Sequence, residues 1–210
     1  MHVRVRDTVK TGVRHYSRAL TSRERNESMT IQIDDAGYGS LVGPTFIGAY
    51  RTETEEFVYG EVALRFFQGT VFRKGEYIRE ASRVIRSLLE QLDSQPSETL
   101  EICTGNIFDD VENTTDHLVQ RTKIEGPLQK AIEDVCENYL VGLGIPIDGV
   151  EPSAKHFRLC LDWVIEDYPE RERYVKTGWP KWGQKWRPIV RSRAARRQRR
   201  AAGRVTHLSP

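Results

Sequence analysis

The chain has 210 residues, 38% of them hydrophobic and 30% charged, which suffices for one ordinary domain with a folded core and terminal segments. Its net charge of +2 combines −13 over residues 29–168 with +4 before them and +11 after them, so an acidic middle region has basic ends. The sequence has no apolar run of about 18 residues and no apolar h-region near its start, which argues against a membrane-spanning helix and a secretory signal. We therefore predict a soluble, cytoplasmic protein without membrane association.

Residues 1–28 show no apolar periodicity and are rich in arginine, which predicts a basic, disordered N-terminal arm. Met29 stands directly before an apolar strand, so we expect either that translation starts at Met29 or that residues 1–28 are a genuine N-terminal extension. Over residues 29–168 the pattern then alternates between strands and helices. We expect strands at Thr30–Asp34, Thr45–Thr52, Glu56–Phe67 and Leu100–Phe108, and helices at Ile78–Leu92, Ile124–Leu143 and Pro152–Tyr168.

The order of these elements indicates the fold class. The short gap Glu53–Glu55 suits a hairpin between two aromatic, β-branched strands. Apolar residues at steps of three and four make the helices amphipathic. The resulting order, β-β-β-α-β-α-(β)-α with an optional last strand, predicts an α/β protein in which helices pack on a mixed sheet.

The C-terminal zone, residues 169–210, differs in composition from the acidic middle. Trp179–Trp186 interleaves tryptophan with lysine, which suits either a strap that covers the core or a surface that stacks on bases. Arg187–Arg204 contains eight arginines and no acid, which predicts a disordered tail. That tail is either a solvated segment or a nucleic-acid-binding arm.

The run Ile33–Pro44, with the sequence IDDAGYGSLVGP, is the segment most indicative of chemistry. Asp34 and Asp35 stand where the first strand ends, and successive strand side chains point to opposite faces, so the two converge only if the backbone turns there. Gly37 and Gly39 permit such a turn and a close approach of a polyanion. Carboxylate oxygens suit Mg²⁺ or Mn²⁺, and a phosphodiester would complete the metal coordination. An Asp-rich turn that only caps a loop is the simpler alternative.

The same run resembles the opening motif of type 2 ribonucleases H, I-D-E-A-G-R-G-P-x-x-G-P. The matching residues are Ile33, Asp34, Ala36, Gly37, Gly39, Gly43 and Pro44, with Asp35 in place of glutamate. The resemblance covers this run of twelve residues and implies a ribonuclease H-like fold. By the same resemblance, Asp34 and Asp35 would be metal ligands, and Gly37, Tyr38 and Gly39 would line the groove where this family reads the ribose 2′-hydroxyl.

The sequence also departs from the family pattern. Tyr38 replaces an arginine, which removes a cation that could contact phosphate. A later strand of the family ends in an acid followed by Gly-Asn, whereas Thr104–Asn106 has threonine at the position of the acid. Asp109 or Asp110 could take over that role. These departures indicate a divergent member of the ribonuclease H-like superfamily.

Other acids are weaker candidates. The family's late helix carries an aspartate four residues after an Ala-Lys pair, and here Asp162 follows Lys155 by seven. Glu76 and Glu80 lie one turn apart on the first helix and are either metal-facing or part of a solvated face. Glu61, among apolar strand residues, faces either the site or water.

Histidine and cysteine offer no clear alternative site. His117 and His156 have no second His or Cys at metal-ligand spacing, so surface or capping roles are expected. Cys103, Cys136 and Cys160 form no CxxC pair and fall on apolar stripes, which predicts core packing without disulfides.

These observations predict a divalent-metal-dependent phosphodiesterase, a nuclease of RNA or RNA/DNA hybrid that uses Mg²⁺ or Mn²⁺ in two-metal hydrolysis. The predicted residues are Asp34, Asp35, Asp110 and Asp162 for catalysis, Asp34, Asp35, Asp109 and Asp110 for metal binding, and Gly37, Tyr38, Gly39 and Asn106 for substrate. One alternative is a ribonuclease H-like domain that has lost catalysis and binds nucleic acid or a protein. Another is a nucleotide phosphate loop of the actin-like ATPase type, whose spacing Ala36 disturbs.

Overall fold

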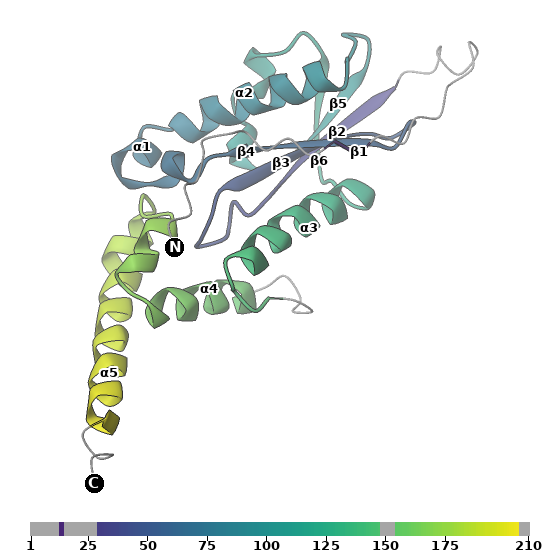
Figure 1. Cartoon of the computed structure of the whole chain (residues 1–210). Helices are drawn as coiled ribbons and strands as arrows, with labels where there is room; N and C mark the ends of the chain where they lie inside the picture. The colour runs from purple at the N-terminus through teal and green to yellow at the C-terminus, as the bar shows by residue number, and fades with distance from the viewer. Residues whose placement is uncertain (1–12, 15–28, 148–153, 206–210) are drawn as a thin grey trace. The chain divides into compact units, whose positions relative to one another are not determined.

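A computed structural model describes residues 13–14, 29–147 and 154–205 (Figure 1). Contacts divide the chain into two compact units. The first unit comprises residues 1–38, 45–62 and 77–136, and the second comprises residues 39–44, 63–76 and 137–210. The sequence predicts one domain over 29–168, whereas this division groups residues 137–168 with the basic C-terminal zone. The predicted N-terminal arm lies outside the described residues apart from 13–14.

The first unit contains a six-stranded mixed sheet with the order β1-β4-β3-β2-β5-β6. Its strands are β1 (Val13–Arg14), β2 (Thr30–Ala36), β3 (Thr45–Arg51), β4 (Glu56–Val62), β5 (Thr99–Cys103) and β6 (Leu118–Thr122). The pairs β1–β4, β3–β4 and β2–β3 are antiparallel, while β2–β5 and β5–β6 are parallel. The predicted α/β class with a mixed sheet is therefore confirmed.

The strands differ from the sequence-based expectation at several points. Strand β4 ends at Val62 instead of Phe67, and the two-residue β1 lies within the arm that the sequence predicts to be disordered. Strand β6 was not predicted, because it is an edge strand in which Leu118 is 63% exposed and no residue is buried. Residues 144–147 form no strand, and the rest of the optional last strand lies outside the described residues. Strand β5 stops at Cys103 instead of Phe108, since Gly105 leads into the 3-10 turns η3 (Asn106–Phe108) and η4 (Val111–Asn113).

Helices α2 (Glu76–Gln91) and α3 (Pro127–Gly142) cover opposite faces of this sheet (Figure 1). Two strand glycines mark where they approach. A Cβ on Gly60 would lie 2.9 Å from Cγ1 of Val84 in α2, and a Cβ on Gly48 would lie 2.8 Å from Cδ1 of Leu128 in α3. Both helices therefore pack closely against the backbone of the central strands.

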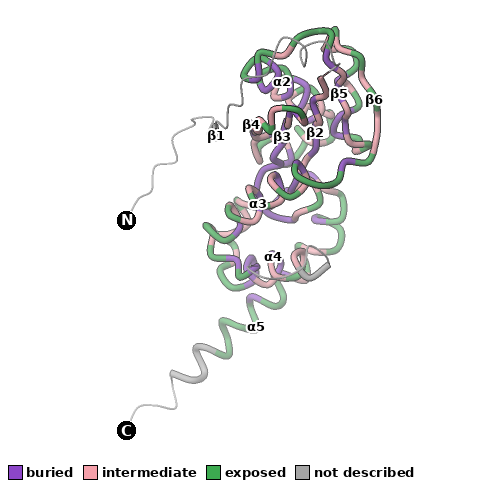
Figure 2. Tube along the Cα trace, turned by 90° about the vertical axis from the view of Figure 1, so that its right-hand side faces the viewer, coloured by how far each residue is buried: buried purple, intermediate pink, exposed green. Residues whose placement is uncertain are grey.

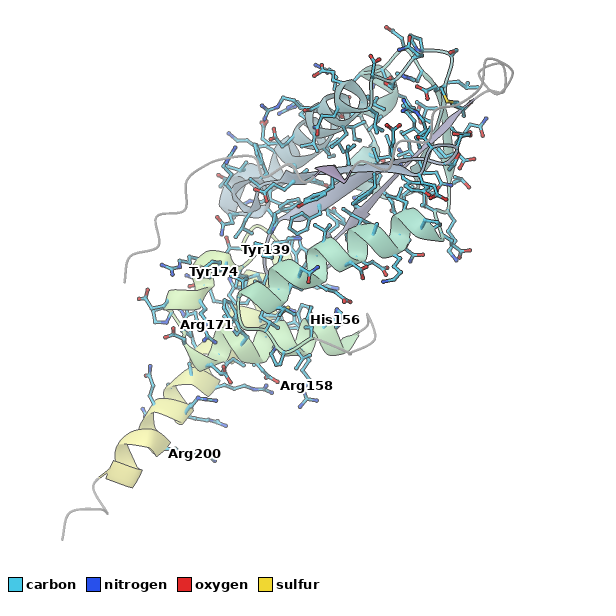
Figure 3. All side chains as sticks on the ribbon, turned by 45° about the vertical axis from the view of Figure 1, so that its right-hand side comes forward. Tyr139, His156, Arg158, Arg171, Tyr174 and Arg200 are labelled. Carbon is cyan, nitrogen blue, oxygen red and sulfur yellow. The ribbon has the colours of Figure 1, made fainter. Side chains whose placement is uncertain are left out.

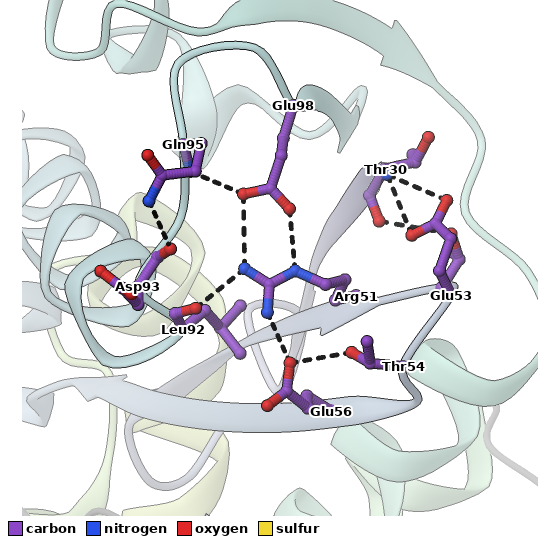
Figure 4. Close-up of polar contacts among 10 residues, drawn as sticks. Thr30, Arg51, Glu53, Thr54, Glu56, Leu92, Asp93, Gln95 and Glu98 are labelled. Atoms are coloured by element: carbon purple, nitrogen blue, oxygen red, sulfur yellow. Dashed lines mark hydrogen bonds and ion pairs between the residues drawn. The ribbon is translucent and has the colours of Figure 1, made fainter. Parts of the chain in front are cut away.

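Arg51, the last residue of β3, forms a buried ion network with the loop after α2 (Figure 4). Nε and Nη2 of Arg51 donate to the two carboxylate oxygens of Glu98 at 2.8 and 3.3 Å, and Nη2 also donates to the carbonyl of Leu92 at 2.8 Å. Nη1 of Arg51 donates to Glu56. Because Glu98 is only 2% exposed and also accepts from the backbone N–H of Gln95, its charge is held inside the protein by this network.

The second unit is mostly helical. Its elements are η2 (Leu64–Phe67), α1 (Gly69–Arg73), α4 (Ala154–Glu166), η5 (Glu170–Tyr174), a π-helical turn η6 (Trp182–Trp186) and α5 (Arg187–Val205). Of the predicted third helix, residues 152–153 lie outside the described residues. Trp182 is 2% exposed and donates from its indole nitrogen to Glu172 at 3.1 Å. Trp186 packs on Phe157 with ring centroids 5.0 Å apart, so these tryptophans have the packing of a strap.

Helix α5 occupies the segment for which the composition predicts disorder, so that prediction is wrong for the described residues (Figure 2). Alanine, arginine and glutamine are strong helix formers. Val190 and Ala194 are also buried, which anchors the first turns of α5. Tertiary packing thus stabilises a helix that its high like charge would otherwise disfavour. In the described part of the chain, no helix is long and apolar enough to span a membrane.

Candidate functional site

The two aspartates of the central strand lie on opposite faces of the sheet. Strand pairing continues through Ala36, so the backbone has not turned at Asp34 or Asp35. Asp34 pairs with Gly48, whose missing side chain admits Leu128 of α3. Asp35 pairs with Ile47, which in turn pairs with Gly60 on the α2 side. Because directly opposed residues share a face, Asp34 faces α3 and Asp35 faces α2.

Asp34 lies in a buried and mostly anionic setting. It is 7% exposed, accepts the thiol hydrogen of Cys103, and accepts the backbone N–H of Asp35 at 2.8 Å. Burial raises the pKa of Asp34, the two hydrogen bonds oppose that rise, and the negative charge of Glu133 adds to it. None of the described groups that shift this pKa is a cation. A bound cation would relieve the desolvation and repulsion that raise the pKa.

Cys103 acts as a hydrogen-bond donor at this site. Burial raises the pKa of its thiol, the backbone contact with Gly105 opposes the rise, and the charges of Asp34 and Asp35 raise it further. The protonated thiol is therefore the favoured form, and it can orient the carboxylate of Asp34. The sequence assigns Cys103 to core packing alone, since its role depends on the pairing of β5 beside β2.

On the other face, Asp35 belongs to a tyrosine cluster at the turn after β2. Gly37 begins that turn with a φ of +86°, a conformation that glycine adopts without strain. The hydroxyl of Tyr38 donates to that of Tyr77 at 3.4 Å, and the side chain of Asn106 is also hydrogen-bonded to Tyr38. Burial and the hydrogen bond with Tyr77 raise the pKa of Tyr38, and the charge of Asp35 adds to the rise. The structure thus brings together Asp35, Tyr38 and Asn106.

Gly39, predicted to line the substrate groove, is exposed and belongs to the short segment assigned to the second unit. A Cβ at this position would meet nothing within 4 Å, so no neighbouring group requires glycine there.

The predicted substitute acids after β5 have other partners. Asp109 lies 3.7 Å from Nη2 of Arg121 and its side chain is 59% exposed. Asp110 accepts from the amide of Asn113 at 3.3 Å. Arg121 also donates to the carbonyls of Gly105 and Phe108, at 3.1 and 2.9 Å, and so holds this loop against β6. No contact places Asp109 or Asp110 beside Asp34 in the described residues. Thr104, which precedes the Gly-Asn pair, is exposed.

The remaining acidic candidates are distributed over both units. Asp162 lies on α4 of the second unit, where its half-exposed carboxylate is 3.7 Å from Nε of Arg158, the residue labelled in Figure 3. Glu76 opens α2 within the second unit, and Glu80 pairs with Arg83 in the first. Strand register places Glu61 on the α3 side of the sheet, the face that Asp34 also uses.

The histidines and the other cysteines have structural partners. Nδ1 of His117 lies 2.7 Å from the hydroxyl of Thr115, while its Nε2 is buried and has no hydrogen-bond partner among the described residues. Cys136 and Cys160 are free thiols and are buried, as predicted.

Sequence reasoning missed Glu133. It lies on α3 one residue after the buried Ile132, and its Oε1 accepts from the amide of Gln129 at 3.1 Å. An acid at the edge of an apolar stripe was a usable signal, because that edge borders the sheet when the stripe is buried. The apolar pattern could not identify Asp34 as the neighbour of Glu133, because the docking of α3 on the sheet is decided only by the tertiary structure.

The chemistry of these donors suits a hard divalent cation. Mg²⁺ typically uses one or two carboxylates and completes its shell with waters and phosphate oxygens. Asp34 and Glu133 supply two carboxylates on one face, so the residues present fit one such ion. In the described part of the chain, no three His, Cys, Asp or Glu side chains are grouped to hold a metal by themselves. Asp35 lies on the opposite face, so the described residues show no second donor set beside Asp34.

Comparison with known proteins does not supply a family. No protein-family model matches this sequence, and no curated protein matches it.

Proposed function

We propose that the chain is a divergent ribonuclease H-like protein that hydrolyses phosphodiester bonds in RNA or in RNA/DNA hybrid with Mg²⁺ or Mn²⁺. The sheet order supports this relationship, because the motif strand β2 is central, with the antiparallel β3 and β4 on one side and the parallel β5 and β6 on the other. The motif Ile33–Pro44 begins on that strand, whose C-terminal end is a common place for functional residues in α/β folds.

The observation that carries the proposal is the state of Asp34. Asp34 is 7% exposed, and its pKa is raised by burial and by the charge of Glu133. An ionised carboxylate in such a place lowers the stability of the fold, and proteins keep such groups mainly where they bind a cation or transfer a proton. Ordinary turn or capping aspartates are solvated and do not incur this cost. The placement of Asp34 therefore favours metal-dependent chemistry over the capping alternative.

In this proposal each residue has a separate role. Asp34 and Glu133 bind the ion, and Cys103 holds the Asp34 carboxylate in position. A divalent ion bound there would supply a water of lowered pKa and stabilise charge on the phosphate. The turn at Gly37 and Tyr38 lets the substrate approach the backbone, and Asn106 fixes the Tyr38 hydroxyl.

The test is cleavage of three labelled substrates: RNA/DNA hybrid, a DNA duplex with one embedded ribonucleotide, and a DNA duplex without one. Each is incubated with Mg²⁺, Mn²⁺ or EDTA. We expect Asp34→Asn and Glu133→Gln to lower the metal-dependent rate by roughly 100-fold or more, which corresponds to about 2.7 kcal/mol of lost transition-state stabilisation. The matched control is Asp134→Asn, which removes the next acid on α3, an exposed residue paired with Lys130. Unchanged cleavage by Asp34→Asn would refute the proposal.

A second function is favoured by a specific observation. Thr104 stands exposed where the family has an acid, and Asp35 faces away from Asp34, so the face of Asp34 presents fewer carboxylates than a two-metal nuclease uses. The alternative is a ribonuclease H-like domain that binds nucleic acid without cleaving it. Folded wild-type protein that binds hybrid in EDTA, yet cleaves none of the three substrates with either metal, would select this alternative.

A further inference from the structure

Helix α5 has two electrostatically different sides. On its inner side, Val190 and Ala194 are buried against the rest of the second unit. Three arginines of α5 contact residues of the preceding segment. Nε of Arg187 lies 2.7 Å from Glu172, and Nε of Arg191 donates to the hydroxyl of Tyr168 at 3.0 Å. Nη1 of Arg197 lies 3.8 Å from Glu166. These contacts fix the rotation of α5 about its own axis.

The other side of α5 presents a stripe of arginines with no acid. We define the arginine stripe by four exposed residues, which are Arg193, Arg196, Arg199 and Arg200. Helical periodicity places them on the sides that Val190 and Ala194 leave open. In the described part of the chain, no hydrogen bond or ion pair joins any of the four to another side chain. Figure 3 shows Arg200 on the part of α5 that extends beyond α4.

This arrangement costs stability in the isolated protein. Like charges three or four residues apart on a helix repel by about 0.2–0.5 kcal/mol per pair. The pairs Arg193–Arg196, Arg196–Arg199 and Arg196–Arg200 have this spacing, and α5 contains no acid that would offset them. A bound polyanion would remove the repulsion.

We propose that the arginine stripe is a docking surface for the phosphate backbone of nucleic acid. Between Arg193 and Arg200 the helix rises about 10 Å, at about 1.5 Å per residue. That length spans about three phosphate-to-phosphate steps of one duplex strand, at about 3.4 Å each, and therefore about four phosphates. Guanidinium groups also bind phosphate oxygens through paired hydrogen bonds. Arginine is enriched in protein interfaces too, but the stripe carries none of the tryptophan, tyrosine, phenylalanine or methionine that accompany it at the centre of such an interface, so a nucleic acid suits it better than an acidic protein.

This inference deepens the proposed function, since it names the surface that would hold the same class of substrate, but it does not require cleavage. It is tested by binding in EDTA, with fluorescently labelled RNA/DNA hybrid and DNA duplex titrated at several salt concentrations. Each neutralised phosphate contributes a slope of about −0.9 in log K against log salt for duplex DNA. Four contacts predict a duplex-DNA slope between −3 and −4, roughly a 100-fold loss of affinity from 50 to 200 mM salt.

The decisive variant changes Arg193, Arg196, Arg199 and Arg200 to glutamine. We expect the slope of log K against log salt to become shallower by about 3 to 4 units. We also expect the affinity at 50 mM salt to fall by at least roughly 100-fold. A matched control changes four exposed basic residues that lie on other elements, Arg65, Arg73, Lys74 and Arg86, and so removes the same charge without touching α5. The control should keep most of the wild-type slope, and circular dichroism checks that both variants retain their helices.

Three outcomes would overturn the inference. They are wild-type protein without salt-dependent binding, a stripe variant with the wild-type slope, and equal losses in the stripe variant and its control. Binding of poly-glutamate in place of nucleic acid would also overturn it and would indicate an acidic protein partner. Failure of the proposed function looks different, because binding in EDTA would then persist and depend on the stripe while no metal supports cleavage.

Discussion

Replacement of Arg51 by methionine is expected to destabilise the first unit strongly. Methionine keeps much of the length and packing of the arginine stem but removes the charge. Glu98 would lose both of its guanidinium bonds, and the carbonyl of Leu92 would lose its donor. Glu98 would then remain 2% exposed with only the N–H of Gln95 as a partner.

The magnitude follows from this burial. Removal of one partner from a buried ion pair costs about 3–5 kcal/mol, because an uncompensated charge stays in the interior. Glu56, which also binds Arg51, is 29% exposed, so Glu56→Gln should cost less than about 1 kcal/mol. The double variant Arg51→Met/Glu98→Met should recover much of the loss, because it removes both charges and fills the space with apolar atoms.

Amide hydrogen exchange is the appropriate assay, because it reports the opening of the sheet separately from the helical second unit. The amides of Ile33 and Ile47 in β2 and β3 would be followed. Arg51 pairs with Ile31 of β2. Asp34 lies three residues further along that strand, about 10 Å from Ile31. The cleavage rate per folded molecule of Arg51→Met should therefore match that of wild type. A loss below about 1 kcal/mol in Arg51→Met, or one equal to that of Glu56→Gln, would refute the reasoning.

Two further predictions concern Asp34 and the glycines of the second unit. Asp34→Asn should stabilise the first unit at pH 7: burial raises the folded pKa of Asp34, so its ionised form costs stability as the pH rises through that pKa. The gain, measured by exchange over a pH series, should vanish below the unfolded pKa of about 4, and equal stability at pH 7 would contradict it. Gly178→Ala should lose about 1–3 kcal/mol, because its Cβ would lie 2.4 Å from Cβ of Phe72 and 2.8 Å from the carbonyl oxygen of Phe67. Gly183→Ala meets nothing within 4 Å and should gain about 0.5–1 kcal/mol, and urea unfolding followed by tryptophan fluorescence would compare the two variants.

The sequence alone predicted the elements that local periodicity encodes. The apolar stripe from Ile78 to Leu92 matches the buried side of α2, and the alternation of Ile31 and Ile33 places β2 in the core. The order of strands and helices was sufficient for the mixed α/β class. It was not sufficient for β6, whose exposed edge lacks an apolar pattern. These successes share a cause, since each signal lies within one segment and needs no partner from elsewhere.

Only the tertiary structure decided which side chains meet. The adjacency of Asp34 and Asp35 suggests a pair of metal ligands. Because β2 stays paired with β3 through both residues, their side chains point to opposite faces of the sheet. Cys103 and Glu133 reach Asp34 because β5 lies parallel to β2 and α3 packs where Gly48 has no side chain. Likewise, α5 is a helix with a distinct outer side because burial of Val190 and Ala194 outweighs its charge repulsion. Such contacts join residues far apart in the chain, and strand register and helix docking, which set them, leave no periodic trace in a single segment.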